Sequence, residues 1–401
     1  MNNKISVEAY KKSGVNISQT TKIKSNIKSL VKKTFSTQVL SEIGLFGGLY
    51  ELKLTTDLPR TFSGVAPVKP GTTPSDLMVR GTQRTSLMNK KFTATESQRA
   101  QRKNQISVDS VSPWQKSKNP VLVSSCDGVG TKVLIAKMMN KHNTVSEDLV
   151  NHCVNDILTL GAKPLFFLDY IAYSDIDSKV IEQVVSSLAN GCKKNNCALI
   201  GGETAMMPGM YKKGEYDLVG FIVGIVEKDK IINGKKIKVG DKLIGIPSSG
   251  LHTNGYSLAR KVFFSDNKFT VKTKLPGLKQ NLGNELLRTH RSYLKEVYPL
   301  LPYISAIAHI TGGAFYKNII RLLPKNLSCL IYKDKWRVPS IFKAIQKYGK
   351  ISEAEMYSVF NMGIGMIIFV PHKNVDKIMR KIPKAKILGE VIKGDFGVEI
   401  F

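Results

Sequence analysis

Apolar residues recur with two different periods between residues 119 and 228. Residues 121–125 are typical of a short strand, whereas the apolar spacing from Leu149 to Leu160 predicts a helix. Thr144 and Glu147 have the spacing of a capping box, so we expect the helix to begin there. Further strands are predicted at 165–172, 197–201 and 218–227, with a helix at 178–194. This alternation predicts helices layered on a sheet.

A second set of elements follows the polar stretch 233–240, which has the composition of an interdomain connection. Strands are predicted at 242–247, 327–332, 363–370 and 385–391, and helices near 255–265, 284–297, 313–323 and 372–381. The whole pattern predicts a mixed α/β (α+β) fold of two α/β domains, comprising residues 1–230 and 231–401.

Residues 53–118 differ from both sets. They contain 12 Lys and Arg against four Asp and Glu, and they have hardly any periodic apolar pattern. Such a segment has too little apolar surface to offset the entropy that ordering would cost. We interpret it as a disordered basic insertion in the first domain, with a basic interaction tail as the alternative.

The chain is strongly basic, with a formal net charge of +29. An excess of cations can indicate nucleic-acid binding, because Lys and Arg neutralise phosphates. Only 11 of the 60 basic residues are Arg, however, and most Lys stand singly or in pairs without a nucleic-acid-binding motif. We therefore predict a solvated, Lys-rich surface and no specific nucleic-acid partner.

The cellular compartment can be predicted from the absence of membrane-span, secretory-signal and CxxC patterns in the sequence. No stretch approaches the roughly 18 uncharged apolar residues that a membrane span requires, and residues 1–5 do not begin a secretory signal. The five Cys have no CxxC spacing, which favours free thiols in a reducing compartment. We predict a cytoplasmic protein without a membrane partner.

A glycine-rich turn follows the first predicted strand of the core and reads Asp-Gly-Val-Gly-Thr-Lys. Gly128 and Gly130 allow backbone N–H groups to approach an anion closely, while Thr131 adds a hydroxyl and Lys132 a positive charge. Asp127 is placed to hold Mg²⁺. The spacing differs from that of a Walker A loop, and a purely structural turn is the alternative.

Two further carboxylates are candidate metal ligands. Asp156 has apolar neighbours on its predicted helix, where an ionised carboxylate requires a partner such as phosphate-bound Mg²⁺. Glu203 follows the strand 197–201 and two glycines, and sites in α/β proteins usually lie at such strand ends. A polar line from Asp148 to Asn155 shares the helix of Asp156, and a solvated helix face is its alternative interpretation.

Two histidines stand beside helix entries rich in Gly, Ser and Thr. His252 lies within residues 248–256, and His309 precedes Thr311 and two glycines. A helix entry of this kind can bind the anion of a sugar phosphate, although a lone His is more often structural. Near the N-terminus, Lys32 and Lys33 are candidates for a phosphate-facing positive charge.

Together these segments resemble the phosphoribosylformylglycinamidine cyclo-ligases, also called aminoimidazole ribonucleotide synthetases. The resemblance covers residues 5–52 and 119–401. The motifs that carry it are 10–15, 127–132, 153–156, 164–170, 201–211, 248–258, 309–313 and 360–363. The chain departs from the family at Cys126, Met206, Leu251 and Ala314, where Thr, Glu, Pro and Gly are usual. Met206 removes a carboxylate next to the proposed metal site.

The resemblance implies two α/β domains with ATP in a cleft between them, and a homodimer whose N-terminal domains pair strands. It also implies ATP-dependent closure of formylglycinamidine ribonucleotide to 5-aminoimidazole ribonucleotide, with release of ADP and phosphate. Sister enzymes of the same ATP-binding superfamily, such as thiamine-phosphate kinase, formylglycinamidine synthetase and selenophosphate synthetase, are the nearest alternatives.

On the matching positions the resemblance implies a role for each candidate residue. The implied ligands of Mg²⁺–ATP are Asp127, Asp156 and Glu203, with K⁺ as a further candidate ion. The implied catalytic residues are His252, His309 and Lys32. The implied ATP-binding residues are Lys33, Gly128, Gly130, Thr131, Lys132 and Asn155. The implied substrate-binding residues are Ser249, Gly250, Asn254, Thr311, Gly312 and Gly313. Proton handling and phosphate binding both remain open for the two histidines.

Overall fold

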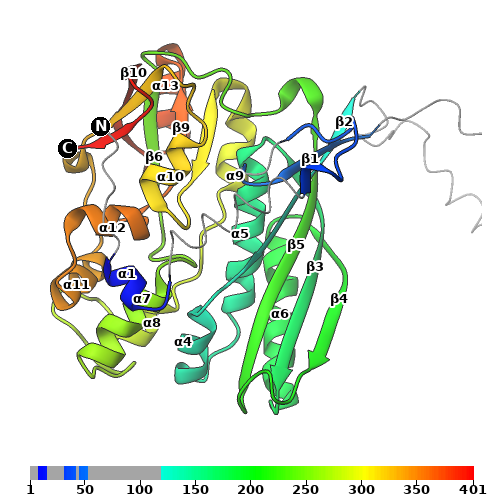
Figure 1. The fold of residues 1–401 in the computed structure, drawn as a ribbon, viewed down its shortest axis with the longest axis vertical. Coiled ribbons are helices and arrows are strands. Elements are labelled where there is room, and N and C mark those ends of the chain that lie inside the picture. Colours follow the sequence, from blue (N-terminus) through cyan, green and yellow to red (C-terminus); the bar gives the residue numbers. More distant parts are fainter. Residues whose placement is uncertain (1–7, 16–30, 42–44, 53–118) are drawn as a thin grey trace, which may run out of the picture. The chain divides into compact units, whose positions relative to one another are not determined.

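The computed structural model describes residues 8–15, 31–41, 45–52 and 119–401. The predicted insertion at 53–118 lies outside the described residues. The described part of the chain is built on two sheets, the first formed by strands up to Glu227 and the second by strands from Lys242 onward (Figure 1). The mixed α/β fold class is therefore confirmed. The division into domains 1–230 and 231–401 stays a prediction.

The first sheet has five strands in the order β1-β2-β5-β3-β4. In that order they are β1 (Gly48–Glu51), β2 (Pro120–Gly128), β5 (Glu215–Glu227), β3 (Lys163–Ser174) and β4 (Ala198–Met206). All neighbours are antiparallel except β3 and β4, which are parallel. Helices α5 (Val145–Thr159) and α6 (Ser178–Lys194) cover one face (Figure 1). In the described part of the chain, the other face carries no helix.

Helix α5 is buried over nearly its whole length, because its apolar side packs on β2, β3 and β5 and its polar side is also covered. The predicted capping box does not form at its start. The hydroxyl of Thr144 has no hydrogen-bond partner among the described residues. Glu147 instead forms an ion pair with Lys194 of α6, at 2.7 Å, which takes the carboxylate that the box would need.

Strand β4 runs farther than the predicted strand 197–201. It continues to Met206 because Gly201–Met206 pairs in parallel register with Leu168–Tyr173 of β3. Glu203 therefore lies opposite Tyr170 in the middle of the pairing and is exposed. The prediction of a carboxylate at a strand end was wrong, since two consecutive glycines did not end the strand.

The second sheet has six strands in the order β11-β8-β10-β6-β9-β7. In that order they are β11 (Val398–Ile400), β8 (Leu327–Ile331), β10 (Lys386–Lys393), β6 (Lys242–Pro247), β9 (Ile364–Val370) and β7 (Ala306–His309). Only β11 and β8 are parallel. The sequence pattern predicts β6, β8, β9 and β10 but misses β7 and β11, which are four and three residues long.

Mostly short helices complete the described part of the chain. They are α1 (Glu8–Lys12), α4 (Lys132–Met139), α7 (Tyr256–Arg260), α8 (Leu282–Leu286), α9 (Leu294–Val297), α10 (Ala314–Ile320), α11 (Ser340–Gly349), α12 (Glu353–Val359) and α13 (Val375–Lys381). Short segments of 3-10 or π-helix occur at η2 (Lys228–Lys230), η3 (Lys261–Asp266), η4 (Tyr298–Tyr303), η5 (Lys333–Lys335) and η6 (His372–Asn374). The sequence pattern does not predict α11 and α12.

The predicted helix near 284–297 is interrupted between α8 and α9. Side chains of the first half of the chain bind the backbone of this interruption. The carboxylate of Asp148 accepts a hydrogen bond from His290 N, and the amide of Asn155 accepts one from Tyr293 N at 2.9 Å. Asn151 donates to His290 O at 2.7 Å. Side chains of α5 thus form the hydrogen bonds that these backbone groups would otherwise form within a helix.

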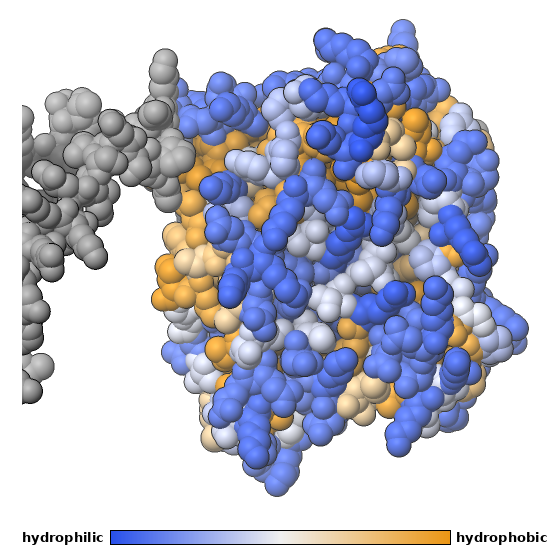
Figure 2. Space-filling view, turned by 180° about the vertical axis from the view of Figure 1, so that it is seen from behind, coloured by the Kyte–Doolittle hydropathy of each residue, from blue (hydrophilic) through white to orange (hydrophobic). Residues whose placement is uncertain are grey.

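Hydrophilic side chains spread over the face seen from behind and do not gather in one patch (Figure 2). This distribution agrees with the predicted solvated, Lys-rich surface. Within the described ranges, no helix combines the length and apolarity that crossing a bilayer would take.

Candidate active site

The turn after β2 places Asp127 beside a histidine. Oδ1 of Asp127 accepts a hydrogen bond from Gly128 N at 2.7 Å, and Oδ2 lies 3.0 Å from Nε2 of His152 on α5. Burial alone would raise the pKa of Asp127, but the charge of His152 and its hydrogen bond lower that pKa to about 2. The Asp127 side chain is ionised and 45% exposed, so it can bind a cationic ligand.

His152 joins Asp127 to the second predicted metal ligand, Asp156. Its Nε2 lies 3.6 Å from Oδ2 of Asp156, one helical turn farther along α5. Burial would lower the pKa of His152, but the two carboxylates outweigh burial and raise it to about 9. His152 therefore carries a positive charge at neutral pH and balances part of the negative charge of this pair.

His309 lies on the other side of Asp156, at the end of β7. Its Nδ1 is 2.7 Å from Oδ1 of Asp156, and its Nε2 is 3.1 Å from Nε2 of His290. Burial lowers the pKa of His309, although the hydrogen bond and charge of Asp156 oppose that shift. His309, at the end of a strand of the second sheet, thus contacts Asp156 on α5, the helix that packs on the first sheet.

His252 is buried and stacks on His290, with ring centroids 3.9 Å apart and planes inclined by 17°. Its backbone φ is 64°, a left-handed conformation that costs energy for a residue with a side chain. Nε2 accepts a hydrogen bond from Ser249 N at 3.2 Å, and Nδ1 has no partner among the described residues. Burial lowers the pKa of His252 well below its usual value, so the ring is neutral.

Three of these histidines have nitrogen atoms close enough to suggest a metal centre. Ligand atoms of His252, His290 and His309 all lie within 4.8 Å of one another. The rings of His252 and His290 are nearly parallel, however, so one ion cannot lie in both ring planes. Ser249 N also takes the lone pair of His252 Nε2. The arrangement is better explained by hydrogen bonds than by a metal ion.

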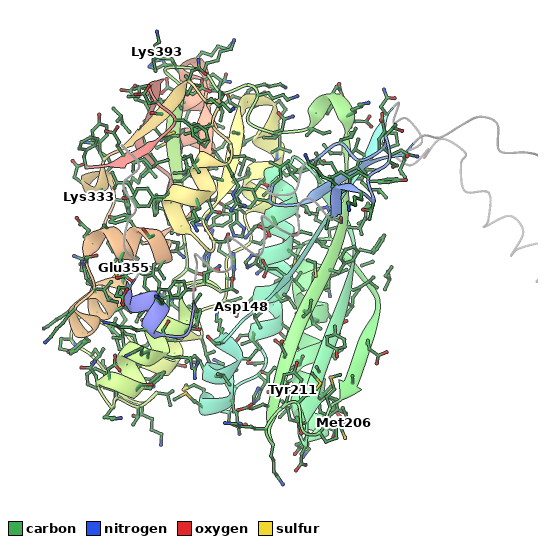
Figure 3. The ribbon with its side chains drawn as sticks, viewed as in Figure 1. Asp148, Met206, Tyr211, Lys333, Glu355 and Lys393 are labelled. Atoms are coloured by element: carbon green, nitrogen blue, oxygen red, sulfur yellow. The ribbon has the colours of Figure 1, made fainter. Side chains whose placement is uncertain are left out.

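Lys132 does not face a ligand, contrary to the predicted contact with ATP phosphates. Its side chain is fully buried and its Nζ lies 2.7 Å from Oδ2 of Asp148 on α5. Nζ also donates to His252 O at 3.0 Å and to Arg288 O at 2.8 Å. Asp148 lies on the side of α5 toward the C-terminal half of the chain (Figure 3). Lys132 therefore ties the two halves together.

The glycine-rich turn is open at Gly130. Gly130 has φ of 55°, and a Cβ added there would meet no atom within 4 Å. The N–H of Gly128 is already bonded to Asp127, so the predicted contact of this turn with phosphate stays a prediction. The hydroxyl of Thr131 lies 3.3 Å from that of Ser257, so the turn also contacts α7.

The two predicted substrate-binding loops meet each other. Oδ1 of Asn254 would lie 3.1 Å from a Cβ added to Gly312, so the two loops approach each other closely at this point. Gly313 has φ of 88° and begins α10, and Thr311 N donates to His309 O at 3.1 Å. On the other loop, Gly250 O accepts hydrogen bonds from Ser248 and Asn361, both at 2.9 Å.

Three predicted site residues stand apart from this cluster. Glu203 is separated from Asp127 by β5 and β3, about 14 Å at the usual strand spacing, so it does not share a metal site with Asp127 in this chain. Lys32 and Lys33 are exposed on the N-terminal segment. Their predicted contact with phosphate stays a prediction.

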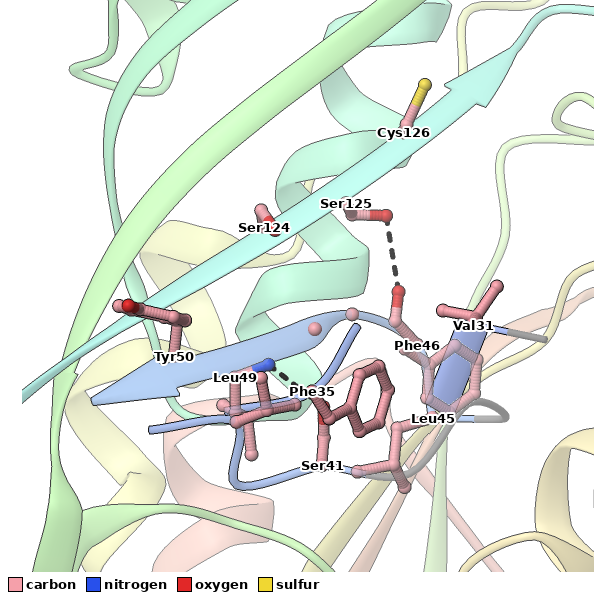
Figure 4. Close-up of a pocket in the computed structure, with 13 residues that line it drawn as sticks. Val31, Phe35, Ser41, Leu45, Phe46, Leu49, Tyr50, Ser124, Ser125 and Cys126 are labelled. Atoms are coloured by element: carbon pink, nitrogen blue, oxygen red, sulfur yellow. Dashed lines mark hydrogen bonds between the residues drawn. The ribbon is translucent and has the colours of Figure 1, made fainter. Parts of the chain in front are cut away.

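A pocket of about 440 Å³ lies between the N-terminal segment and β2 (Figure 4). Its lining is largely apolar and includes Val31, Phe35, Leu45, Phe46 and Leu49. Ser125 also lines it, and the Ser125 hydroxyl donates either to Phe46 O at 3.2 Å or to Asp156 Oδ2 at 3.3 Å. The pocket therefore adjoins the carboxylates of the site.

The sequence does not predict the roles of His152 and His290 or the burial of Lys132. The predicted contact of Asn155 with ATP was also wrong, because Asn155 is buried and its amide binds the backbone of Arg291 and Tyr293. The signal for His152 is its position four residues before Asp156, which puts both side chains on one face of the helix. The line of polar residues from Asp148 to Asn155 is the feature of the sequence that indicates the covered polar face of α5. No local pattern points to His290, because it stands where a helix was predicted.

Comparison with known proteins gives the family. Residues 111–226 match the model for the N-terminal domain of AIR synthase related proteins, and residues 238–400 match the C-terminal domain. Phosphoribosylformylglycinamidine cyclo-ligase of Thermoanaerobacter pseudethanolicus is 44% identical over 97% of this chain and 99% of its own. The cyclo-ligase of Geobacter metallireducens is 50% identical over 71% of this chain and 83% of its own.

Solved structures with less similar sequences share the fold. A chain of a HypE–HypF complex has a TM-score of 0.51 at 17% identity, covering 70% of this chain and 86% of its own. Thiamine-monophosphate kinase of Stenotrophomonas maltophilia has a TM-score of 0.51 at 16% identity, covering 70% of this chain and 85% of its own. The two domain matches, together with the near-complete match to curated relatives, show that the chain belongs to the phosphoribosylformylglycinamidine cyclo-ligase family.

Proposed function

We propose that this protein is the ATP-dependent cyclo-ligase of purine biosynthesis that converts formylglycinamidine ribonucleotide to 5-aminoimidazole ribonucleotide, ADP and phosphate. The observation that carries the proposal is 44% identity to a cyclo-ligase over 97% of this chain and 99% of that relative. The cluster of carboxylates, histidines and glycine-rich loops supports the same chemistry.

The reaction needs an activated formyl oxygen and then ring closure. ATP phosphorylates the formyl oxygen, which converts it to a leaving group. The ribosyl-bearing amidine nitrogen attacks the activated carbon, phosphate leaves, and the nitrogen loses a proton. Phosphoryl transfer depends mainly on positioning and charge neutralisation, so the protein needs no covalent intermediate of its own.

Asp127 is the residue that would hold Mg²⁺ in this arrangement. The side chain of Asp156 is only 8% exposed, and its oxygens lie 2.7 Å from His309 and 3.3 Å from Ser125, so its role as a metal ligand stays a prediction. Asp127 fits because its carboxylate is ionised and partly exposed beside the open turn at Gly130. Magnesium would supply neutralisation of the phosphate charge. The apolar pocket beside Ser125 is the candidate for the base of ATP, since it adjoins the same carboxylates. A role for K⁺ and a cytoplasmic location stay predictions.

His309 and His252 are the candidates for taking the proton that the attacking nitrogen loses. Burial lowers the pKa of both rings, and a neutral imidazole can accept a proton. Asn254 and the turn at Gly312 and Gly313 are the candidates for holding the substrate, because the two loops meet beside these rings.

Genetic complementation tests the proposed activity. Expression of this chain in a bacterium that lacks its own cyclo-ligase should restore growth without added purine. The relative from Thermoanaerobacter pseudethanolicus serves as the positive control. If this chain accumulates as soluble protein and the strain still requires purine, the proposed activity is wrong for this chain.

We further propose that the protein is a homodimer joined through the uncovered face of the first sheet. Cross-strand pairing places apolar side chains together on that face; they are Tyr50, Leu122, Leu168, Tyr170, Val219, Phe221 and Ile225. Phe221 and Tyr50 are 38% and 42% exposed. A contiguous exposed apolar face of this kind is typical of an interface, and a second copy is the occupant that the cyclo-ligase resemblance implies.

Replacing Phe221 by Asp should convert a dimer to a monomer, because the charge would lose its water at the centre of the interface. Light scattering coupled to gel filtration measures the mass directly. Val239→Asp is the matched control, since Val239 is 59% exposed in the connection between the sheets and should leave the mass unchanged. A wild-type protein of single-chain mass would contradict the proposed dimer.

A further inference from the structure

His290 occupies the centre of the histidine cluster. Its ring stacks on His252, and its Nε2 lies 3.1 Å from Nε2 of His309. The segment that carries it, Arg288–Tyr293, is pinned to α5 by bonds from the backbone to Asp148, Asn151 and Asn155. The position of His290 relative to both candidate catalytic rings is therefore fixed from the opposite half of the chain.

The amide of Asn155 determines which nitrogen of His290 carries the hydrogen. Oδ1 of Asn155 accepts a hydrogen bond from Tyr293 N at 2.9 Å, and Nδ2 donates to Arg291 O at 2.8 Å. These two bonds exclude the flipped orientation of the amide. Nδ2 also lies 3.2 Å from Nε2 of His290, and Nδ2 can only donate. Nε2 of His290 is therefore the acceptor.

The hydrogen of the neutral His290 ring then sits on Nδ1. Burial lowers the pKa of His290 well below its usual value, which agrees with a ring that carries a single hydrogen. Nδ1 faces the hydroxyl of Thr253 at 3.4 Å. Thr253 in turn lies 2.7 Å from Nδ1 of His152, so the same hydroxyl connects His290 to the charged histidine beside Asp127.

His290 also contacts His309. Nε2 of His309 lies 3.1 Å from Nε2 of His290, which has no hydrogen to give, so any hydrogen between these two nitrogens belongs to His309. Nδ1 of His309 lies 2.7 Å from Oδ1 of Asp156. The ring of His309 is thus held between His290 and Asp156.

We propose that His290 is a positioning residue, whose Nε2 accepts a hydrogen bond from Asn155 and faces Nε2 of His309, and which so holds His309 in its reactive orientation. This inference rests on the proposed function for its effect on turnover. The tautomer of His290 can be tested independently of that function.

Replacing His290 by Gln or by Asn distinguishes the roles of its two ring nitrogens. Gln can place an amide oxygen near the position of Nε2, whereas Asn reaches only the position of Nδ1. His290→Gln should keep at least about a third of kcat, and His290→Asn should lose about 10- to 100-fold, as expected for a misplaced proton-transfer group. KM for ATP should change less than about twofold in both, because His290 does not contact the glycine-rich turn.

His142→Gln is the matched control. His142 is also buried, and its Nδ1 lies 2.8 Å from the hydroxyl of Tyr216, outside the cluster. Its replacement should leave kcat unchanged. Equal kcat for His290→Gln and His290→Asn would overturn the inference, whether both equal the wild type or both are reduced.

Nitrogen-15 NMR of the full-length protein with labelled histidine decides the tautomer without any variant. The expected spectrum assigns hydrogen to Nδ1 of His290 and an unprotonated shift to its Nε2. Hydrogen on Nε2 of His290 would overturn the inference even if the enzyme is active. An inactive wild type with the expected His290 spectrum would contradict the proposed function and leave the tautomer assignment supported.

Discussion

Lys132→Met is expected to lower the free energy of unfolding by about 3–5 kcal/mol. The ammonium of Lys132 is fully buried and lies 2.7 Å from Asp148. Burial raises the pKa of Asp148 to about 6 against the opposing charge of Lys132, and burial lowers the pKa of Lys132. Removing one charge leaves the other without a partner, and it also frees the carbonyls of His252 and Arg288.

Denaturant unfolding of Lys132→Met and the wild type measures this effect. Lys137→Met on the same helix is the control, because Lys137 lies at the surface 3.6 Å from Glu215 and should change stability by less than about 0.5 kcal/mol. Adding Asp148→Asn to Lys132→Met should recover part of the loss, since no unpaired charge remains. A loss below about 1 kcal/mol for Lys132→Met would show that this ion pair does not hold the two halves together.

Asp127→Asn is expected to reduce turnover at least about 100-fold while the protein stays folded. The asparagine can still accept the hydrogen bond from His152, which lies 3.0 Å from Asp127. It lacks the negative charge that a magnesium ion requires. Because the change keeps size and hydrogen bonding, a large loss of turnover would come from the charge.

Steady-state kinetics with saturating Mg²⁺ and ATP, together with a thermal melt, separate activity from folding. Asp175→Asn is the control, since Asp175 is an exposed carboxylate paired with Lys213 at 2.7 Å outside the cluster. Turnover of Asp127→Asn within a few fold of the wild type would exclude the proposed metal role of Asp127.

Much of the fold could be predicted because apolar periodicity reports burial. Helix α6 spans the predicted residues 178–194, and β6 spans the predicted 242–247. The errors occur where distant contacts decide local structure. Glycines 201 and 202 suggest a loop, yet pairing with β3 keeps them in a strand. The segment Arg288–Tyr293 has helical spacing, yet bonds to α5 open it.

The site was predicted less completely than the fold. Motifs located Asp127, Asp156, His252 and His309, and the structure brings these four residues into one hydrogen-bonded and stacked cluster. The motifs could not show that Lys132 is buried, because a Lys after a glycine-rich turn has the same sequence pattern whether it meets a phosphate or a carboxylate. His290 depends on contacts across 135 positions with Asn155, which no local pattern contains.

We propose above that this chain closes the imidazole ring with conversion of ATP to ADP and phosphate. The most direct measurement incubates the purified full-length protein with Mg²⁺, ATP and formylglycinamidine ribonucleotide, and follows ADP and 5-aminoimidazole ribonucleotide together. We expect substrate-dependent release of ADP, matched one for one by the aminoimidazole product. ADP release without that product, or no turnover by folded protein, would show that the chain does not have this activity.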